Sequence, residues 1–453
     1  MEKLNFKTYT LDKSFEIKGY FSDNCEELES DKAISGILSY KYDQIVLELF
    51  GSLDSLEDGL LGMVNAPEVI YGYSSDGKLL ILNCYGYVFG TDHYPGFSLS
   101  KFHIKNFKIY DVYYNQLQQK IPDIINFLSD DPVIYYDFSF ENIEQWVDKA
   151  IFRAREINGE LTIATNVTNY QPTKVYITNR ELYLEDHAIA SANDDFLNLS
   201  SKYYLRLSNQ NNELEFSPCH ETACQILKYI EVVSESPISF TEISFLSKYK
   251  YVDDGKRLPL IRGKYFFQHS REGKNWSKFE HKEITLNALH ERFERILGHW
   301  FSKSEKLDFI INQYTKSLHS VPYIEDNLLS TIRNLEVYAR SFHEEKIRKY
   351  EHENKIFKNR KKESFLKSKL IFLFENSDSG FESLILESFN NVSHFIDSIV
   401  QTRNYYTHGN KKSKYPRLIT DYNDLYKANM ILQKLLHYYL FKELGMEFSF
   451  NKY

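Results

Sequence analysis

The sequence is poor in cysteine and in the residues that interrupt regular structure. Its 453 residues include 4 cysteines, 10 prolines and 18 glycines. So few cysteines exclude a dense disulfide framework and make a reducing cytosol the expected compartment. No apolar run approaches the roughly 18 residues that span a membrane, and the first residues lack the apolar segment of a signal peptide. We therefore expect a cytoplasmic protein with no membrane partner.

Patterns for phosphate-binding loops and for metal centres are missing as well. The chain has no GxGxxG loop and no Walker-type loop. One segment, Cys219-His220-x-x-x-Cys224, contains metal-ligand residue types. A structural zinc site needs four ligands, however, and no second Cys/His pair has a suitable spacing. We therefore predict no metal and no cofactor.

The net charge of −8 results from two unlike regions. Residues 1–300 contain 31 Lys/Arg and 44 Asp/Glu, so their net charge is 31 − 44 = −13. Residues 301–453 contain 24 Lys/Arg and 19 Asp/Glu, so theirs is 24 − 19 = +5. An acidic body followed by a basic region favours a polyanionic partner at the C-terminal end only.

Hydrophobic periodicity changes from strand-like to helical along the chain. Up to about residue 285, short apolar segments alternate with a period of two, and Asp76-Gly77 marks a β-hairpin turn. From about Leu286, apolar residues recur three and four positions apart. We predict an α+β chain whose β-rich N-terminal modules are sandwich or barrel-like and precede a C-terminal all-α helical bundle. The expected domains are a β-rich module at 1–134, a second with inserted helices at 135–285, and an α-helical domain at 286–453.

Apolar spacing and capping residues predict several helices in the C-terminal domain, and three of them bear on the site. One covers about 325–349, and another begins near Leu384 and delivers Arg403. The last starts near Asp421, with Thr420 or Asp421 as its N-cap, and ends at Gly445.

Arg403, Asn404 and His408 stand within six positions where the second of these helices meets Gly409-Asn410. The fork of donors on an arginine can hold a phosphate, and a histidine can move a proton near neutral pH. Together they can cleave RNA without a metal ion. The alternative is an arginine paired with an acidic neighbour and a solvated histidine.

Spacing alone does not single out this motif. With 15 arginines and 14 histidines, an arginine followed five positions later by a histidine is expected about 0.5 times by chance. Looser spacing also matches Arg180/His187, Arg262/His269 and Arg292/His299. Of these matches, Arg403 alone is followed directly by an amide and then by a helix-ending turn, so the context favours Arg403.

Helix geometry constrains how Arg403 and His408 can act. Five residues of ideal helix rotate by about 500°, which leaves the two side chains roughly 140° apart. We expect either that the helix unwinds near Thr407 or that a second copy of the site faces the first across a dimer interface.

Residues near the motif carry further hypotheses. Glu336 either pairs with Arg340, four positions on, or adds a polar group to the cleft. Tyr405 and Tyr406 either stack on RNA bases or pack an interface. A basic segment of Lys411, Lys412, Lys414 and Arg417 either follows an RNA backbone or is a solvated loop.

Four segments together resemble a known family. They are residues 402–409, 335–340, 138–146 and 204–207. The chain resembles the ApeA-type antiphage HEPN proteins of bacteria, in which a β-rich N-terminal region precedes a C-terminal HEPN domain.

The resemblance implies a metal-independent endoribonuclease that forms a homodimer with both motifs at the shared interface. Arg403 would then hold the scissile phosphate, Asn404 would orient the phosphate or a catalytic group, and His408 would be the general acid or base for attack by the 2′-OH. We expect the N-terminal region either to restrain this activity or to sense its trigger, for example a phage protein. The alternative is a non-catalytic HEPN module for dimerisation or RNA binding.

Overall fold

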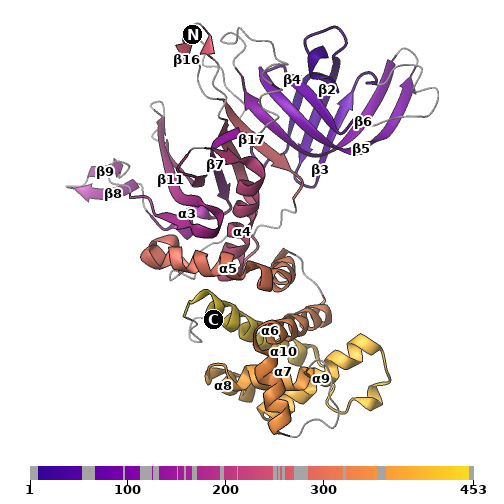
Figure 1. Ribbon diagram of the computed structural model, residues 1–453, viewed down its shortest axis with the longest axis vertical. Helices are drawn as coiled ribbons and strands as arrows, with labels where there is room; N and C mark the ends of the chain where they lie inside the picture. Colours follow the sequence, from indigo (N-terminus) through magenta and orange to yellow (C-terminus); the bar gives the residue numbers. More distant parts are fainter. Residues whose placement is uncertain are drawn as a thin grey trace. The chain divides into compact units, whose positions relative to one another are not determined.

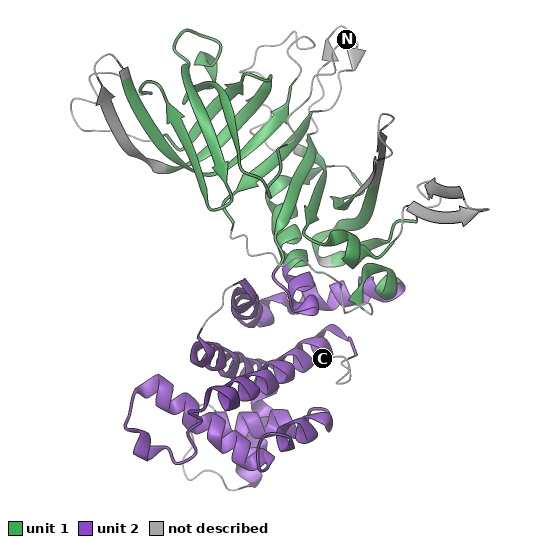
Figure 2. Ribbon diagram, turned by 180° about the vertical axis from the view of Figure 1, so that it is seen from behind, with its two compact units in different colours: residues 1–227, 238–290 green, residues 228–237, 291–453 purple. Residues whose placement is uncertain are grey.

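Figure 1 shows the computed structural model of the protein. It describes residues 9–53, 67–94, 97–112, 125, 132–149, 152–157, 160–165, 171–193, 198–211, 213–247, 252–253, 256–257, 261–269, 284–319, 323–354 and 364–447. Two compact units make up the chain, one of residues 1–227 with 238–290 and one of residues 228–237 with 291–453 (Figure 2). We call them the β-rich unit and the helical unit.

The β-rich unit begins with a closed six-stranded barrel. Its strands are β1 (Phe15–Ser22), β2 (Ile34–Lys41), β3 (Gln44–Leu49), β4 (Val69–Ser74), β5 (Lys78–Tyr94) and β6 (Phe97–Asp111). They pair in the order β6-β3-β2-β1-β4-β5, and β5 pairs with β6 to close the ring. Gly77 has a φ of 79° in the turn between β4 and β5, a backbone conformation that glycine adopts without strain. Fully buried Phe21, Leu38 and Leu47 contribute to the core.

The sheet continues beyond the barrel through β6. The C-terminal half of β6 pairs with β17 (Arg262–Phe267), and the order then runs β17-β14-β7-β12-β11-β10. These strands are β14 (Phe240–Ser247), β7 (Pro132–Phe140), β12 (Asn198–Ser208), β11 (Leu182–Asn193) and β10 (Lys174–Ile177).

Short elements and one long helix complete this part of the chain. They are β8 (Phe152–Ile157), β9 (Glu160–Thr165), β13 (Leu214–Glu215), β15 (Val252–Asp253), β16 (Lys256–Arg257), α3 (Ile143–Val147) and α4 (Phe216–Ser234). On α4, Phe216 packs against Phe245 of β14, with ring centroids 5.2 Å apart. The first part of α4 thus covers the sheet with an aromatic side chain.

The helical unit is built around one long central helix, α6 (Ile324–Glu353). Its other elements are α5 (Leu286–His319), which begins in the β-rich unit, α7 (Leu366–Glu375), α8 (Gly380–Leu386), α9 (Val392–His408) and α10 (Tyr422–Leu444). Helix α6 packs against α7, α9 and α10. Its central position follows from its apolar face, where Leu328, Ile332 and Leu335 are buried.

The predicted fold class is confirmed. A β-rich N-terminal region with a barrel precedes an all-α region, and the Asp76-Gly77 hairpin forms between β4 and β5. The last helix has its N-cap at Asp421 and its C-cap at Gly445, as predicted. The three-domain division at 134/135 and 285/286 stays a prediction.

The prediction of a single helix from about 384 to 403 is wrong. The structure has two helices there, α8 and α9. The Asn391 side chain accepts a hydrogen bond from the backbone N–H of His394, which caps the start of α9. The capping amide therefore starts a new helix where the apolar spacing alone suggested continuity.

Candidate functional site

Helix α9 carries Arg403, Asn404 and His408 on its last two turns. Phe395, Ile399 and Thr402 are buried, so this face holds the helix in the unit. The Thr402 hydroxyl accepts a hydrogen bond of 3.0 Å from the backbone N–H of Ile419. This bond fixes the returning chain beside the helix one residue before Arg403.

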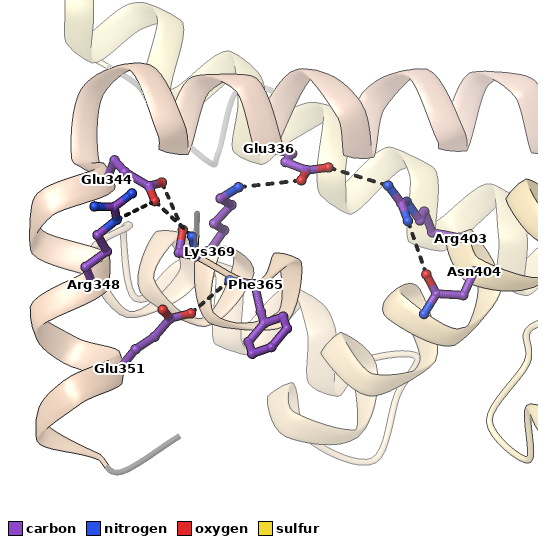
Figure 3. A network of polar contacts seen from close by, with 9 residues as sticks. Glu336, Glu344, Arg348, Glu351, Phe365, Lys369, Arg403 and Asn404 are labelled. Atoms are coloured by element: carbon purple, nitrogen blue, oxygen red, sulfur yellow. Dashed lines mark hydrogen bonds and ion pairs between the residues drawn. The ribbon is translucent and has the colours of Figure 1, made fainter. Parts of the chain in front are cut away.

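The guanidinium of Arg403 has two polar contacts in the described structure. Its Nη1 donates to the Asn404 side-chain oxygen at 3.2 Å, and its Nη2 lies 3.8 Å from the Glu336 carboxylate (Figure 3). The Arg403 side chain is 32% exposed. One neighbouring amide thus orients the guanidinium, and a single long ion pair leaves donors directed elsewhere.

Glu336 of α6 lies between two cations. One carboxylate oxygen is 3.5 Å from the Lys369 ammonium, and the other is 3.8 Å from Arg403 (Figure 3). The hypothesis that Glu336 adds a polar group beside the motif agrees with these contacts.

His408 is the last residue of α9, and its side chain is exposed. Of the two alternatives for Arg403 and His408, the one in which the helix unwinds near Thr407 is wrong. Helical structure continues to His408, and the Gly409 N–H donates to the Tyr405 carbonyl at 2.9 Å. Gly409 adopts a left-handed backbone with a φ of 60°, so the turn begins only after the histidine. The rotation of an unbroken helix therefore directs Arg403 and His408 to different sides of α9.

The basic segment after α9 divides into two parts. Lys411, Lys412 and Lys414 are exposed around the short 3-10 turn Lys412–Lys414. Arg417 pairs with Asp397 of α9, and its backbone N–H donates to Gln401 at 2.8 Å. Arg417 thus anchors the loop to the helix, whereas the three lysines face solvent.

Tyr405 and Tyr406 form a small aromatic group at the end of α9. Their ring centroids are 5.1 Å apart, and the Tyr405 ring lies 6.1 Å from that of Tyr415. Both rings are half-buried. Burial, followed by the nearby charge of Glu325, raises the pKa of Tyr406. The Tyr406 phenol is therefore neutral, and its ring is available for packing.

Two functional candidates were missed by sequence reasoning. Lys369 was not singled out in the sequence, but its side chain is 1% exposed. The signal was present, because Lys369 precedes Leu370 and stands four positions before Leu373 on the buried face of α7. Asp397 was also missed, although it binds both Arg417 and Lys367.

Cys219, His220 and Cys224 lie in the β-rich unit, where both ring nitrogens of His220 have neighbouring polar atoms. His220 Nδ1 is 2.8 Å from the Tyr136 hydroxyl, and its Nε2 is 3.8 Å from the Cys224 sulfur. Burial, with a smaller contribution from Lys108, lowers the pKa of His220 to about 4. Within the described ranges, no group of three or more His, Cys, Asp or Glu residues is arranged to hold a metal ion.

None of the helices in the described ranges combines the length and the apolarity needed to cross a membrane.

Two family models match the chain. The model for ApeA N-terminal domain 1 matches residues 16–300, and the model for Apea-like HEPN matches residues 329–449. The second range includes Glu336, Lys369, Arg403 and His408. No curated protein and no solved structure matches the chain.

Proposed function

The chain belongs to the ApeA family and ends in an Apea-like HEPN domain, and from this premise we propose that it is a metal-independent endoribonuclease of a bacterial antiphage system. The observation that supports the proposal most is the state of Arg403. Its side chain is one-third exposed, and its guanidinium is oriented by Asn404 and held by Glu336 through one long contact. Such a guanidinium can donate hydrogen bonds to a phosphate without first breaking a strong ion pair.

The proposed reaction uses the 2′-hydroxyl of RNA as the nucleophile. His408 takes the 2′-OH proton as the oxygen attacks phosphorus, and the bond from phosphorus to the 5′-oxygen breaks. The leaving 5′-oxygen takes up a proton. Arg403 stabilises the negative charge that grows on the phosphoryl oxygens, and Asn404 fixes the guanidinium. The products are a 2′,3′-cyclic phosphate and a 5′-hydroxyl.

The unbroken helix supports a homodimer as part of this proposal. Because α9 remains helical to His408, one chain directs Arg403 and His408 apart by roughly 140°. A second copy related by twofold symmetry can place its own histidine beside this arginine. The proposed active site therefore takes Arg403 from one subunit and His408 from the other.

The exposed lysines Lys411, Lys412 and Lys414 extend the proposed site along the RNA. They begin three positions after His408 in the chain, and each phosphate contact would add affinity and salt sensitivity. Tyr405 and Tyr406 offer aromatic faces, which stack on any base.

We assign restraint of the nuclease to the N-terminal region, with a phage protein as the trigger. Residues 1–300 carry 31 − 44 = −13 charges, so they can compete with RNA for a basic site. Deleting residues 1–280 should raise toxicity in cells. A truncated chain that folds and is harmless would count against this assignment.

Cleavage of RNA by the purified full-length protein tests the activity itself. We expect cyclic phosphate ends, full activity in EDTA, and a loss of about 10²–10³ in rate for Arg403→Ala or His408→Ala. His352→Ala is the matched control, because His352 is also an exposed histidine in the last turn of a helix. Inhibition by EDTA would indicate a metal-dependent nuclease instead.

Expression in cells separates catalysis from a purely binding role. Wild type should be toxic on overexpression, and Arg403→Ala and His408→Ala should be harmless. If all three proteins are harmless and the variants still protect against phage, the domain is a non-catalytic module for dimerisation or RNA binding. Sequencing of RNA ends after induction, with and without His408→Ala, identifies the RNA that is cut.

A further inference from the structure

Lys369 is a buried cation next to the motif. Its side chain is 1% exposed, and its ammonium lies 3.5 Å from Glu336. A buried ammonium is costly unless a carboxylate compensates it. On the other side of Lys369, burial opposes ionisation of Glu344, but hydrogen bonds from Ser364, the contact with Arg348 and the charge of Lys369 together lower the pKa of Glu344. Lys369 is thus held in place by the negative charges of α6.

The start of α7 fixes where this ammonium lies. The Ser364 N–H and hydroxyl both donate to Glu344 at 2.9 Å, and the Phe365 N–H donates to Glu351 at 2.9 Å. Two carboxylates of α6 therefore bind the backbone immediately before α7, as Figure 3 shows. Lys369 follows one turn later on the buried face of α7, so its ammonium cannot move far from Glu336.

The charge count around Glu336 has a direct consequence for Arg403. Lys369, Glu336 and Arg403 together carry +1 − 1 + 1 = +1. Without Lys369, the whole charge of Glu336 would act on Arg403, and the sum would fall to zero. A closed, neutral Arg–Glu pair competes with a phosphate for the same guanidinium donors. With Lys369 present, the carboxylate is shared and the cluster keeps a net positive charge.

We propose that Lys369 is a positioning residue that holds the Glu336 carboxylate and so leaves Arg403 available to the phosphate of the substrate. The inference rests on the proposed function, because it assigns Lys369 a part in substrate binding at the same site. Lys369 itself does not touch the substrate. It acts through Glu336, which requires that the effects of changing the two residues depend on each other.

Charge rescue in the full-length protein tests the proposal. Lys369→Met should lower kcat/KM for a short RNA by about tenfold, mainly through a higher KM. Adding Glu336→Gln to this variant restores the +1 charge and should recover kcat/KM to within about threefold of wild type. Lys303→Met is the matched control, because it removes an ammonium from another Lys–Glu pair of the helical unit, with Glu443 at 2.8 Å. It should change kcat/KM by less than about twofold.

A binding measurement keeps this test separate from the test of cleavage. Affinity for a 2′-deoxy oligonucleotide, which cannot be cut by 2′-OH attack, should fall in Lys369→Met and recover in the double variant. Lys369→Gln is a second neutral variant in case Lys369→Met does not fold, and thermal unfolding gives the folded fraction used for normalisation. Unchanged affinity and kcat/KM in both neutral variants, or no recovery with Glu336→Gln, would overturn the proposal. If affinity changes as expected but no protein cleaves RNA, the positioning role stands and the proposed nuclease activity fails.

Discussion

Two arginines, one in each unit, meet an acidic partner in different ways. Arg206 of the β-rich unit binds Asp137 through Nε and Nη2, both at 2.7 Å, and its guanidinium stacks 3.8 Å from the centre of the Tyr135 ring. Arg403 of the helical unit approaches Glu336 at 3.8 Å through one nitrogen. The first arginine has its fork of donors filled by a carboxylate, whereas the second keeps donors for a ligand. The difference separates a structural ion pair from the proposed binding site.

Two histidines repeat the contrast. His220 is enclosed in the β-rich unit, where burial lowers its pKa to about 4 and Tyr136 occupies one ring nitrogen. His408 is exposed at the end of α9. A buried neutral imidazole stabilises a fold, and an exposed imidazole at a helix end can exchange protons with a substrate. His220 thus stabilises the β-rich unit, whereas His408 is presented to solvent at the end of α9.

The largest expected effect is on catalysis and comes from Arg403→Ala. The rate of RNA cleavage should fall by about 10²–10³, because the variant lacks the group that stabilises the phosphoryl charge. The free energy of unfolding should change by less than about 1 kcal/mol, since the ion pair with Glu336 is long and partly exposed. Single-turnover cleavage and thermal unfolding measure the two quantities. If the loss in the free energy of unfolding were as large as the rise in the activation free energy of cleavage, Arg403 would be a structural residue like Arg206.

Arg206→Ala should show the opposite behaviour. It leaves Asp137 buried without its bidentate partner, so unfolding should become easier by about 3 kcal/mol. The folded protein should cleave RNA at close to the wild-type rate. Urea denaturation and a cleavage assay well below the midpoint test both statements. Loss of cleavage in a fully folded Arg206→Ala protein would contradict the division of roles.

The pH dependence of stability comes next. The pKa of His220 is about 4 in the folded chain and 6.5 in the unfolded chain, so the unfolded chain binds the extra proton between these values. The stability that neutral His220 contributes is therefore fully present above pH 6.5 and is lost as the pH drops toward 4. The free energy of unfolding should be about 2 kcal/mol lower at about pH 5 than at about pH 7. His220→Asn should remove this part of the slope in urea titrations, and an unchanged slope would show that other groups cause it.

The smallest expected effect comes from the lysines after α9. Replacing Lys411, Lys412 and Lys414 together by alanine should weaken RNA binding by about tenfold at moderate salt. If each lysine contacts one phosphate, the slope of log affinity against log salt should decrease by about 2. Fluorescence titration with a 2′-deoxy oligonucleotide at several salt concentrations measures the slope. Since Arg417 is bound to Asp397, Arg417→Ala should instead alter the loop, and an identical slope change in both variants would contradict this distinction.

Local signals in the sequence predicted the turns and helix ends that one or two residues determine. Asp76-Gly77 forms its hairpin because glycine allows the positive φ, and Asp421 and Gly445 end α10 as capping residues do. The closure of the barrel between β5 and β6 was not predictable as a pairing, because the sequence pattern shows which residues face inward but not which strands meet.

The candidate site was predicted as a set of residues more readily than as an arrangement. The sequence identifies Arg403, Asn404 and His408 and the end of their helix. It does not reveal that Lys369 is buried against Glu336, because that contact joins two helices whose packing depends on the whole unit. The expected unwinding at Thr407 was wrong because Gly409, rather than an earlier residue, takes the left-handed conformation.

Mixing two inactive variants tests most directly whether Arg403 and His408 act across a dimer. Purified Arg403→Ala and His408→Ala proteins, each inactive alone, are allowed to exchange subunits and then assayed for RNA cleavage. Half of the dimers formed at random are mixed, and each mixed dimer has one intact site of two. The account therefore predicts about a quarter of the wild-type activity. A mixture that exchanges subunits, as shown by differently tagged chains, and remains inactive would contradict it.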